Sequence, residues 1–168
     1  MQTNYCKYCD KVHELNVLEH TEVCDIKEEK IEYIKKEYLC KKTNKIFTTP
    51  DLDDINQLEA KDIYRRKHNL LTSKDIKQIR EKYSLSQSDL ALILGWGEVT
   101  ITRYETKEIQ NEKYDNVLRK INDNPYILYD YFEINKDCFD QKKQIKISKK
   151  IISVSPSEEH ANKLIEQS

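Results

Sequence analysis

The sequence predicts an α+β fold, in which a small β-rich domain with cysteines is followed by an all-α domain built around a helix-turn-helix. Apolar and polar residues alternate around Leu15 and Val17, which is the period of a half-buried strand. Further along, apolar residues recur at helical spacing instead. The only two glycines, Gly95 and Gly97, lie between two such helical segments, where a sharp turn needs a permissive backbone.

The chain divides into four predicted parts: a small β-rich domain (1–46), a linker helix (47–72), a helix-turn-helix domain (73–133) and a basic, partly flexible tail (134–168). In the first part, Glu28-Glu29-Lys30 is the expected turn between two strands. In the second, Thr49 is the expected helix cap and Pro50 the first helical residue. One face of this helix is expected to hold Leu52, Ile55, Leu58 and Ile63.

Capping residues also set the boundaries in the helical domain. Thr72 or Ser73 is expected to cap its first helix and Ser86 its second, while Asn122-Asp123-Asn124-Pro125 ends the fourth. In the tail, isoleucines and a valine between lysines over 144–155 predict an extended segment or edge strand. Ser155-Pro156-Ser157-Glu158 resembles a capping box and predicts a short helix to about residue 165.

Composition narrows the class of protein. No apolar run approaches the roughly 20 residues of a membrane helix, and the first residues lack the pattern of a secretion signal. Five cysteines, an odd number, indicate thiols or a metal site rather than a disulfide framework. We therefore expect a cytoplasmic protein without membrane contact.

The net charge of −1 hides an uneven distribution. Residues 10–32 carry eight acids and three lysines, whereas 61–83 carry eight Lys/Arg and three acids, and 134–150 six lysines and two acids. The two basic stretches border the predicted helix-turn-helix, where a phosphate-binding surface is expected. The alternative is an ordinary solvated charged surface.

In a helix-turn-helix the second helix enters the major groove of DNA. Here it is expected to start near Glu98, with Ile101 and Tyr104 facing inward and Val99, Thr100 and Arg103 on the opposite side. The predicted DNA contacts are Arg103 to guanine, Thr100 and Thr102 to bases or phosphates, Val99 to a thymine methyl and Gln87 to a phosphate.

Other residues of this segment have expected structural roles. Glu105 is repelled by phosphates and is expected to pair with Arg80, and Trp96 is expected to cover the turn. The alternatives are that the two helices pack without any DNA contact, and that Arg103 binds a phosphate or only solvent.

Two segments carry a family resemblance: Leu85-Ser86-Gln87-Ser88-Asp89-Leu90-Ala91 and Thr102-Arg103-Tyr104-Glu105 are similar to the Cro/lambda-repressor-like helix-turn-helix. With Lys67-His68-Asn69-Leu70-Leu71-Thr72 and Leu94-Gly95-Trp96-Gly97-Glu98, the chain resembles the MqsA/YgiT-type antitoxins over about residues 5–133. That resemblance implies a homodimer that represses its own operon and binds a cognate toxin. Val99 stands near the place of the family's asparagine reader.

Cys6-Lys-Tyr-Cys9 has the spacing with which two thiolates bind one zinc ion. The resemblance implies a zinc ribbon with a second CxxC pair, which is half present as Cys40 and has Thr43 in the last position. The predicted metal ligands are therefore Cys6, Cys9 and Cys40.

A rival zinc set combines the first two cysteines with His20 and Cys24, at nearly the spacing of a finger. A third possibility is thiols without metal. Cys138 is expected to be an ordinary thiol, and His13, His68 and His160 are expected to be surface histidines.

No Gly-rich phosphate loop, nucleophile elbow or HExxH motif indicates an enzyme. The sequence favours a DNA-binding repressor that is the antitoxin of a type II toxin–antitoxin system. The alternatives are a stand-alone regulator of a mobile element, and a protein-interaction adaptor in which the helix-turn-helix is only a scaffold.

Overall fold

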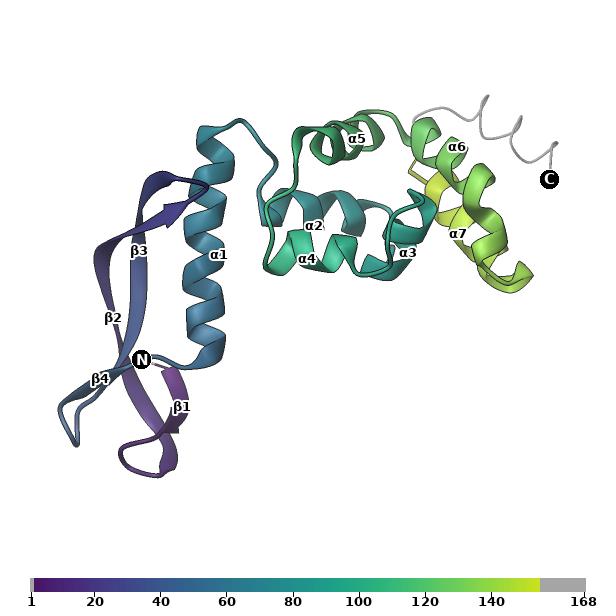
Figure 1. The fold of residues 1–168 in the computed structure, drawn as a ribbon. Coiled ribbons are helices and arrows are strands. Elements are labelled where there is room, and N and C mark those ends of the chain that lie inside the picture. The colour runs from purple at the N-terminus through teal and green to yellow at the C-terminus, as the bar shows by residue number, and fades with distance from the viewer. Residues whose placement is uncertain (1, 155–168) are drawn as a thin grey trace. The chain divides into compact units, whose positions relative to one another are not determined.

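The computed structural model describes residues 2–154, which form two compact units divided between Asn69 and Leu70. The first unit is an antiparallel sheet with one long helix, and the second consists of helices (Figure 1). The chain is therefore α+β, as the sequence predicts. Among the described residues, no helix combines the length and the apolar character needed to cross a membrane.

Four strands form the sheet of the first unit, in the order β1 (Gln2–Cys6), β2 (Lys11–Ile26), β3 (Glu29–Cys40) and β4 (Lys45–Phe47). A two-residue turn joins the long strands β2 and β3. Lys27 and Glu28 form it with φ of 48° and 67°, angles that favour the tight hairpin turn usually built by Asn and Gly. The turn expected at Glu28-Glu29-Lys30 is thus displaced toward the N-terminus.

Helix α1 (Pro50–Lys67) follows the sheet, with Thr49 as its cap and Pro50 in its first turn, as predicted. The amide of Asn56 accepts from the backbone N–H of Lys36 and donates to its carbonyl, both at 2.9 Å. This side chain thereby satisfies the edge of β3 as another strand would. Residues 47–72 were expected as a linker, but α1 belongs to the first unit, and Ile55 on its expected inner face is 55% exposed.

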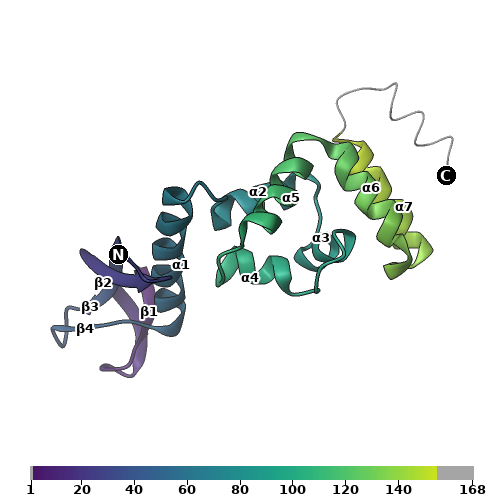
Figure 2. The same ribbon diagram turned by 45° about the horizontal axis from the view of Figure 1, so that its top comes forward.

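The second unit contains α2 (Ser73–Lys82), α3 (Gln87–Ile93), α4 (Thr100–Thr106), α5 (Glu112–Asp123), α6 (Pro125–Asn135), a 3-10 turn η1 (Lys136–Cys138) and α7 (Gln141–Ile152). The hydroxyls of Thr72 and Ser86 cap α2 and α3, as predicted. Asn124 caps the start of α6, where α5 ends. Helices α6 and α7 lie side by side (Figure 2).

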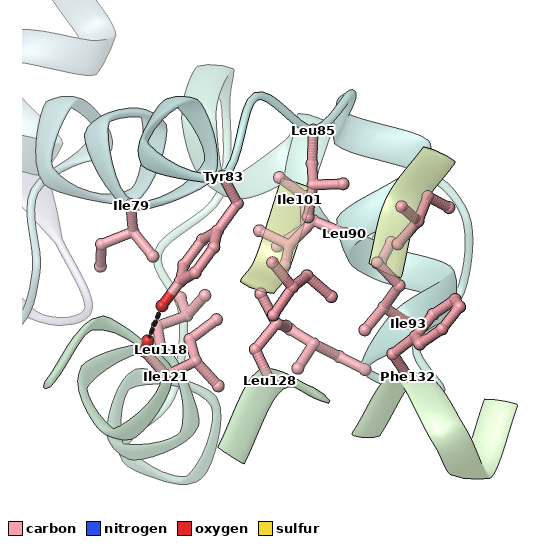
Figure 3. Close-up of a cluster of buried hydrophobic side chains, with 14 of the residues drawn as sticks. Ile79, Tyr83, Leu85, Leu90, Ile93, Ile101, Leu118, Ile121, Leu128 and Phe132 are labelled. Carbon is pink, nitrogen blue, oxygen red and sulfur yellow. Dashed lines mark hydrogen bonds between the residues drawn. The ribbon is translucent and has the colours of Figure 1, made fainter. Parts of the chain in front are cut away.

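One apolar core holds these helices together (Figure 3). Its fully buried side chains come from every helix of the unit, including Ile76, Leu90, Ile101, Leu118 and Leu128. Tyr83 is also fully buried, and its hydroxyl donates to the carbonyl of Ile121 at the end of α5. Burial raises the pKa of Tyr83 to about 12, so the hydroxyl remains a donor at neutral pH.

Helix α7 corrects the expected extended segment over 144–155. Ile147 and Ile151, four residues apart, are 2% and 1% exposed, whereas Ile145 is 57% exposed. Asp140 caps this helix through the backbone N–H of Lys143. A helical period therefore decides the structure, and the short alternation of isoleucine and lysine was misleading. The helix predicted after Ser155 lies outside the described residues.

Candidate nucleic-acid interface and metal centre

Helices α3 and α4 meet at the glycine turn as a helix-turn-helix. Gly95 has φ of +69°, a conformation that favours glycine, so the sharp turn depends on this residue. Leu90 and Ala91 of α3 and Ile101 of α4 are fully buried, and Tyr104 is 8% exposed. The inward face predicted for the second helix is therefore confirmed, although the helix begins at Thr100.

An ion pair fixes α4 against α2. The guanidinium of Arg80 donates to both carboxylate oxygens of Glu105, at 2.7 and 3.0 Å, and to the carbonyl of Leu85 at 2.9 Å. The side chain of Glu105 is only 4% exposed. The predicted pairing of Glu105 with Arg80 is thus present, and it neutralises a carboxylate close to the expected DNA surface.

Gln87 connects this ion pair to the reader helix. Its amide nitrogen donates to Glu105 at 2.7 Å, and its amide oxygen accepts from the hydroxyl of Thr102 at 2.9 Å. Both residues were predicted to contact DNA. In the structure they contact each other, which positions the first turn of α3 beside α4.

The outward face of α4 holds the remaining predicted readers. Val99 is 54% exposed, and the side chain of Arg103 is 57% exposed. The only acid beside Arg103 is Glu108, itself exposed, with 3.8 Å between Nε and Oε1. Thr100 is half-buried at the start of the helix. Arg103 is therefore a mobile cation at the surface, available to a base edge or a phosphate.

Trp96 covers the turn from inside. Its ring packs edge-on against Tyr114 at 4.6 Å between centroids and against Tyr104 at 6.5 Å. These contacts link the turn to α5, which agrees with the structural role expected for Trp96.

The first unit brings together four potential metal ligands. The ligand atoms of Cys6, Cys9, His13 and Cys40 all lie within 4.8 Å of one another. Sγ of Cys40 lies 3.4 Å from Sγ of Cys9 and 3.7 Å from Nε2 of His13. Ligands of a tetrahedral zinc ion with bonds of about 2.3 Å are about 3.8 Å apart. The cluster can therefore hold a metal ion.

His13 is oriented for ligation. Its Nδ1 lies 2.8 Å from the carbonyl oxygen of Glu14, which can only accept, so Nδ1 carries the proton. The neutral ring then presents the lone pair of Nε2 to the cluster. A histidine that ligates a metal commonly has its other nitrogen held in this way.

Hydrogen bonds also polarise the thiols. The pKa of Cys40 is lowered to about 6, chiefly by a hydrogen bond from the Thr43 hydroxyl. The pKa of Cys9 is raised to about 11, chiefly by its hydrogen bond to Cys40. Thr43, which stands where the resemblance implies a cysteine, therefore favours the thiolate of Cys40.

His13 was expected to be a surface histidine, and this expectation is wrong. The pairing of β1 with β2 sets it opposite Asn4, next to both cysteines of the knuckle. The spacing Cys9-x3-His13 is the signal in the sequence that could have identified it. The rivals His20 and Cys24 lie farther along β2, and Cys24 packs against a different apolar cluster.

The comparison with known families identifies the second unit. Residues 76–111 match the family described as helix-turn-helix, from α2 to the start of α5. No curated protein and no solved structure matches the chain. The second unit is thus a DNA-binding domain of the kind that transcription regulators carry.

The buried ion pair gives a first prediction. Glu105→Ala leaves the guanidinium of Arg80 without its carboxylate and should lower the free energy of unfolding of the second unit by about 3–5 kcal/mol. Trp96, the only tryptophan, reports this transition by fluorescence during urea unfolding. The matched control is Glu108→Ala, which removes an exposed carboxylate and should cost about 0–1 kcal/mol. Equal effects of the two variants would contradict the central role of Glu105.

Proposed function

We propose that this protein is a sequence-specific transcriptional repressor that acts as a homodimer on its own operator, as the antitoxin of a type II toxin–antitoxin system. The observation that carries the proposal is the helix-turn-helix of α3 and α4, with its inner face locked by Glu105 and its outer face left to Arg103 and Val99. The match over residues 76–111 supports its DNA-binding part.

The reader helix would enter the major groove with Arg103 on a guanine and Val99 against a thymine methyl. Thr100 would reach bases or phosphates from the start of α4. Gln87 and Thr102, bonded to each other, would approach the backbone as one unit. A dimer would place two half-sites about one helical turn apart on a pseudo-palindromic operator.

The antitoxin assignment rests on the combination of two units. The resemblance to the MqsA/YgiT-type antitoxins pairs such a helix-turn-helix with a metal-binding β-rich domain, and both parts occur here in that order. In this proposal the first unit binds the cognate toxin, and the second binds DNA.

Zinc is the proposed metal of the first unit. Three thiolates and one imidazole form the Cys3His donor set of structural zinc sites. Bound there, zinc would join β1, the start of β2 and the end of β3. Four protein ligands leave no open position, so the ion would serve folding and not catalysis.

DNA reading is tested by fluorescence anisotropy on duplexes tiled through the DNA upstream of the protein's own gene. One duplex should bind far more tightly than a shuffled duplex of equal composition. Arg103→Ala should weaken binding to that duplex by about 1–3 kcal/mol and leave the shuffled duplex unaffected, because a base contact carries the specificity. Glu108→Ala, which removes the acid beside Arg103, is the control and should retain specific binding. Equal affinity of the wild type for all duplexes would contradict sequence-specific repression.

The antitoxin role is tested by co-expression with the adjacent gene. The neighbouring product alone should arrest growth, and the full chain should restore growth and co-purify with it. The variant Arg103→Ala should still neutralise and co-purify, because toxin binding is assigned to the first unit. A neighbour that is harmless, or that never co-purifies, favours a stand-alone regulator.

The metal assignment is tested by titrating zinc into the reduced, chelator-treated full chain. We expect one ion per chain, and a loss of affinity of more than about 100-fold in His13→Ala, since a ligand matters at least as much as its supporting shell. His20→Ala is the matched control and should bind zinc like the wild type. Chelation should expose residues 2–47 to protease and leave Trp96 fluorescence unchanged. Unaltered affinity in His13→Ala would remove it from the ligand set.

A further inference from the structure

Helix α7 carries a concentrated positive charge that the helix-turn-helix alone does not explain. Its 12 residues include five lysines and no acid. Ile147 and Ile151 are buried in the core of the second unit, which fixes the helix on its neighbours. The family match ends at residue 111, so α7 is an addition outside the matched segment.

Three of these lysines are free to bind an anion. Lys142, Lys146 and Lys149 are spaced by four and three residues, which places them on one face of the helix. All three are exposed, and none pairs with an acid of the described residues. A row of like charges without counter-charges is an electrostatic attractor for a polyanion.

The other two lysines hold α7 beside the helix-turn-helix. Nζ of Lys143 lies 2.6 Å from Oδ1 of Asp89 in the first turn of α3. Lys150 donates to the carbonyl of Ser84, in the loop that leads into α3. Helix α7 therefore lies along the start of α3.

Helix α3 separates α7 from the reader helix. Gln87 bonds to Thr102 of α4, while Asp89 bonds to Lys143 of α7. Two residues along a helix differ by about 200° in direction, so these contacts lie on opposite sides of α3. The lysine row thus lies next to the helix that flanks the DNA groove, on the side away from α4.

A hollow of about 230 Å³ between α3 and α7 shows that the row is open on this side. Its charged lining comprises Asp89, Asp140, Lys142, Lys143, Lys146 and Lys150. Both acids are already engaged, since Asp89 pairs with Lys143 and Asp140 caps the start of α7. The charge left uncompensated is positive.

We propose that α7 is a second DNA-binding element, in which Lys142, Lys146 and Lys149 contact phosphates beside the groove that α4 enters. This inference rests on the proposed DNA-binding function and adds a backbone contact to it. Lys142 and Lys149 are seven residues apart, about 10 Å along the helix, which equals about three phosphates of one strand at 3.4 Å each. The contact carries no sequence information.

The test compares two 30-base-pair duplexes: the upstream duplex that the wild type binds best and a shuffled one. The triple variant Lys142→Gln/Lys146→Gln/Lys149→Gln should bind both more weakly. Each lost phosphate contact lowers the salt slope by about 0.9, so the ratio of wild-type to variant affinity should shrink about 40-fold between ~50 and ~200 mM salt. The triple Lys→Arg variant keeps the charge and should keep the slope.

A single-charge comparison guards against a general charge effect. Lys146→Gln should lower the slope by about 0.9, whereas Lys120→Gln should not. Lys120 is exposed in the last turn of α5, which lies across the helical unit from α3 and α4 (Figure 1). Trp96 fluorescence confirms that each variant is folded.

The outcomes separate this inference from the proposed function. An unchanged slope in the Lys→Gln variants, with the wild type still binding, overturns the role of α7 alone. Loss of binding in the lysine variants while Arg103→Ala has no effect supports α7 and contradicts the base reader. A wild type that binds neither duplex overturns both proposals.

Discussion

The second unit depends on the carboxylate of Glu105. It accepts two hydrogen bonds from Arg80 of α2 and one from Gln87 of α3, although it belongs to α4 itself. Three helices are thereby tied at one point, and a half-buried charge is compensated where an unpaired one would be costly. The same bonds orient Gln87 toward Thr102, so the position of the reader helix follows from this ion pair. Apolar packing holds α4 in the core, and the ion pair determines how it is rotated there.

The first unit is held together by different means. Its apolar contacts are split into two small clusters, one around Leu15 and Tyr38 and the other around Ile31 and Ala60. A small domain with divided cores buries little apolar surface, and such domains commonly rely on metals. The cluster of Cys6, Cys9, His13 and Cys40 joins the strands near the first of these cores. A metal there would supply the cross-link that packing provides in the helical unit.

The sequence predicts what is determined locally and fails where partners are set by pairing or by burial. Helix caps such as Thr49 and Ser86 follow from the residues around them, and the Arg80–Glu105 pair followed from excluding a carboxylate from a DNA surface. His13 was missed because its place beside the cysteines depends on the register of β1 with β2. Helix α7 was missed because Ile145 and Ile147 alternate like a strand, while burial selects Ile147 with Ile151.

The charges of the chain explain why a protein of net charge −1 can bind a polyanion. Acids outnumber lysines by eight to three over residues 10–32, in the first unit, while the lysines of α7 lie in the second. A net charge near zero does not describe the field at a surface, because charges beyond about 10 Å are screened at physiological salt. What a phosphate meets is the local set: Arg103 on the reader helix and the lysine row beside α3. Base reading and backbone binding are thus assigned to separate helices that contact α3 on opposite sides, so either can change without displacing the other.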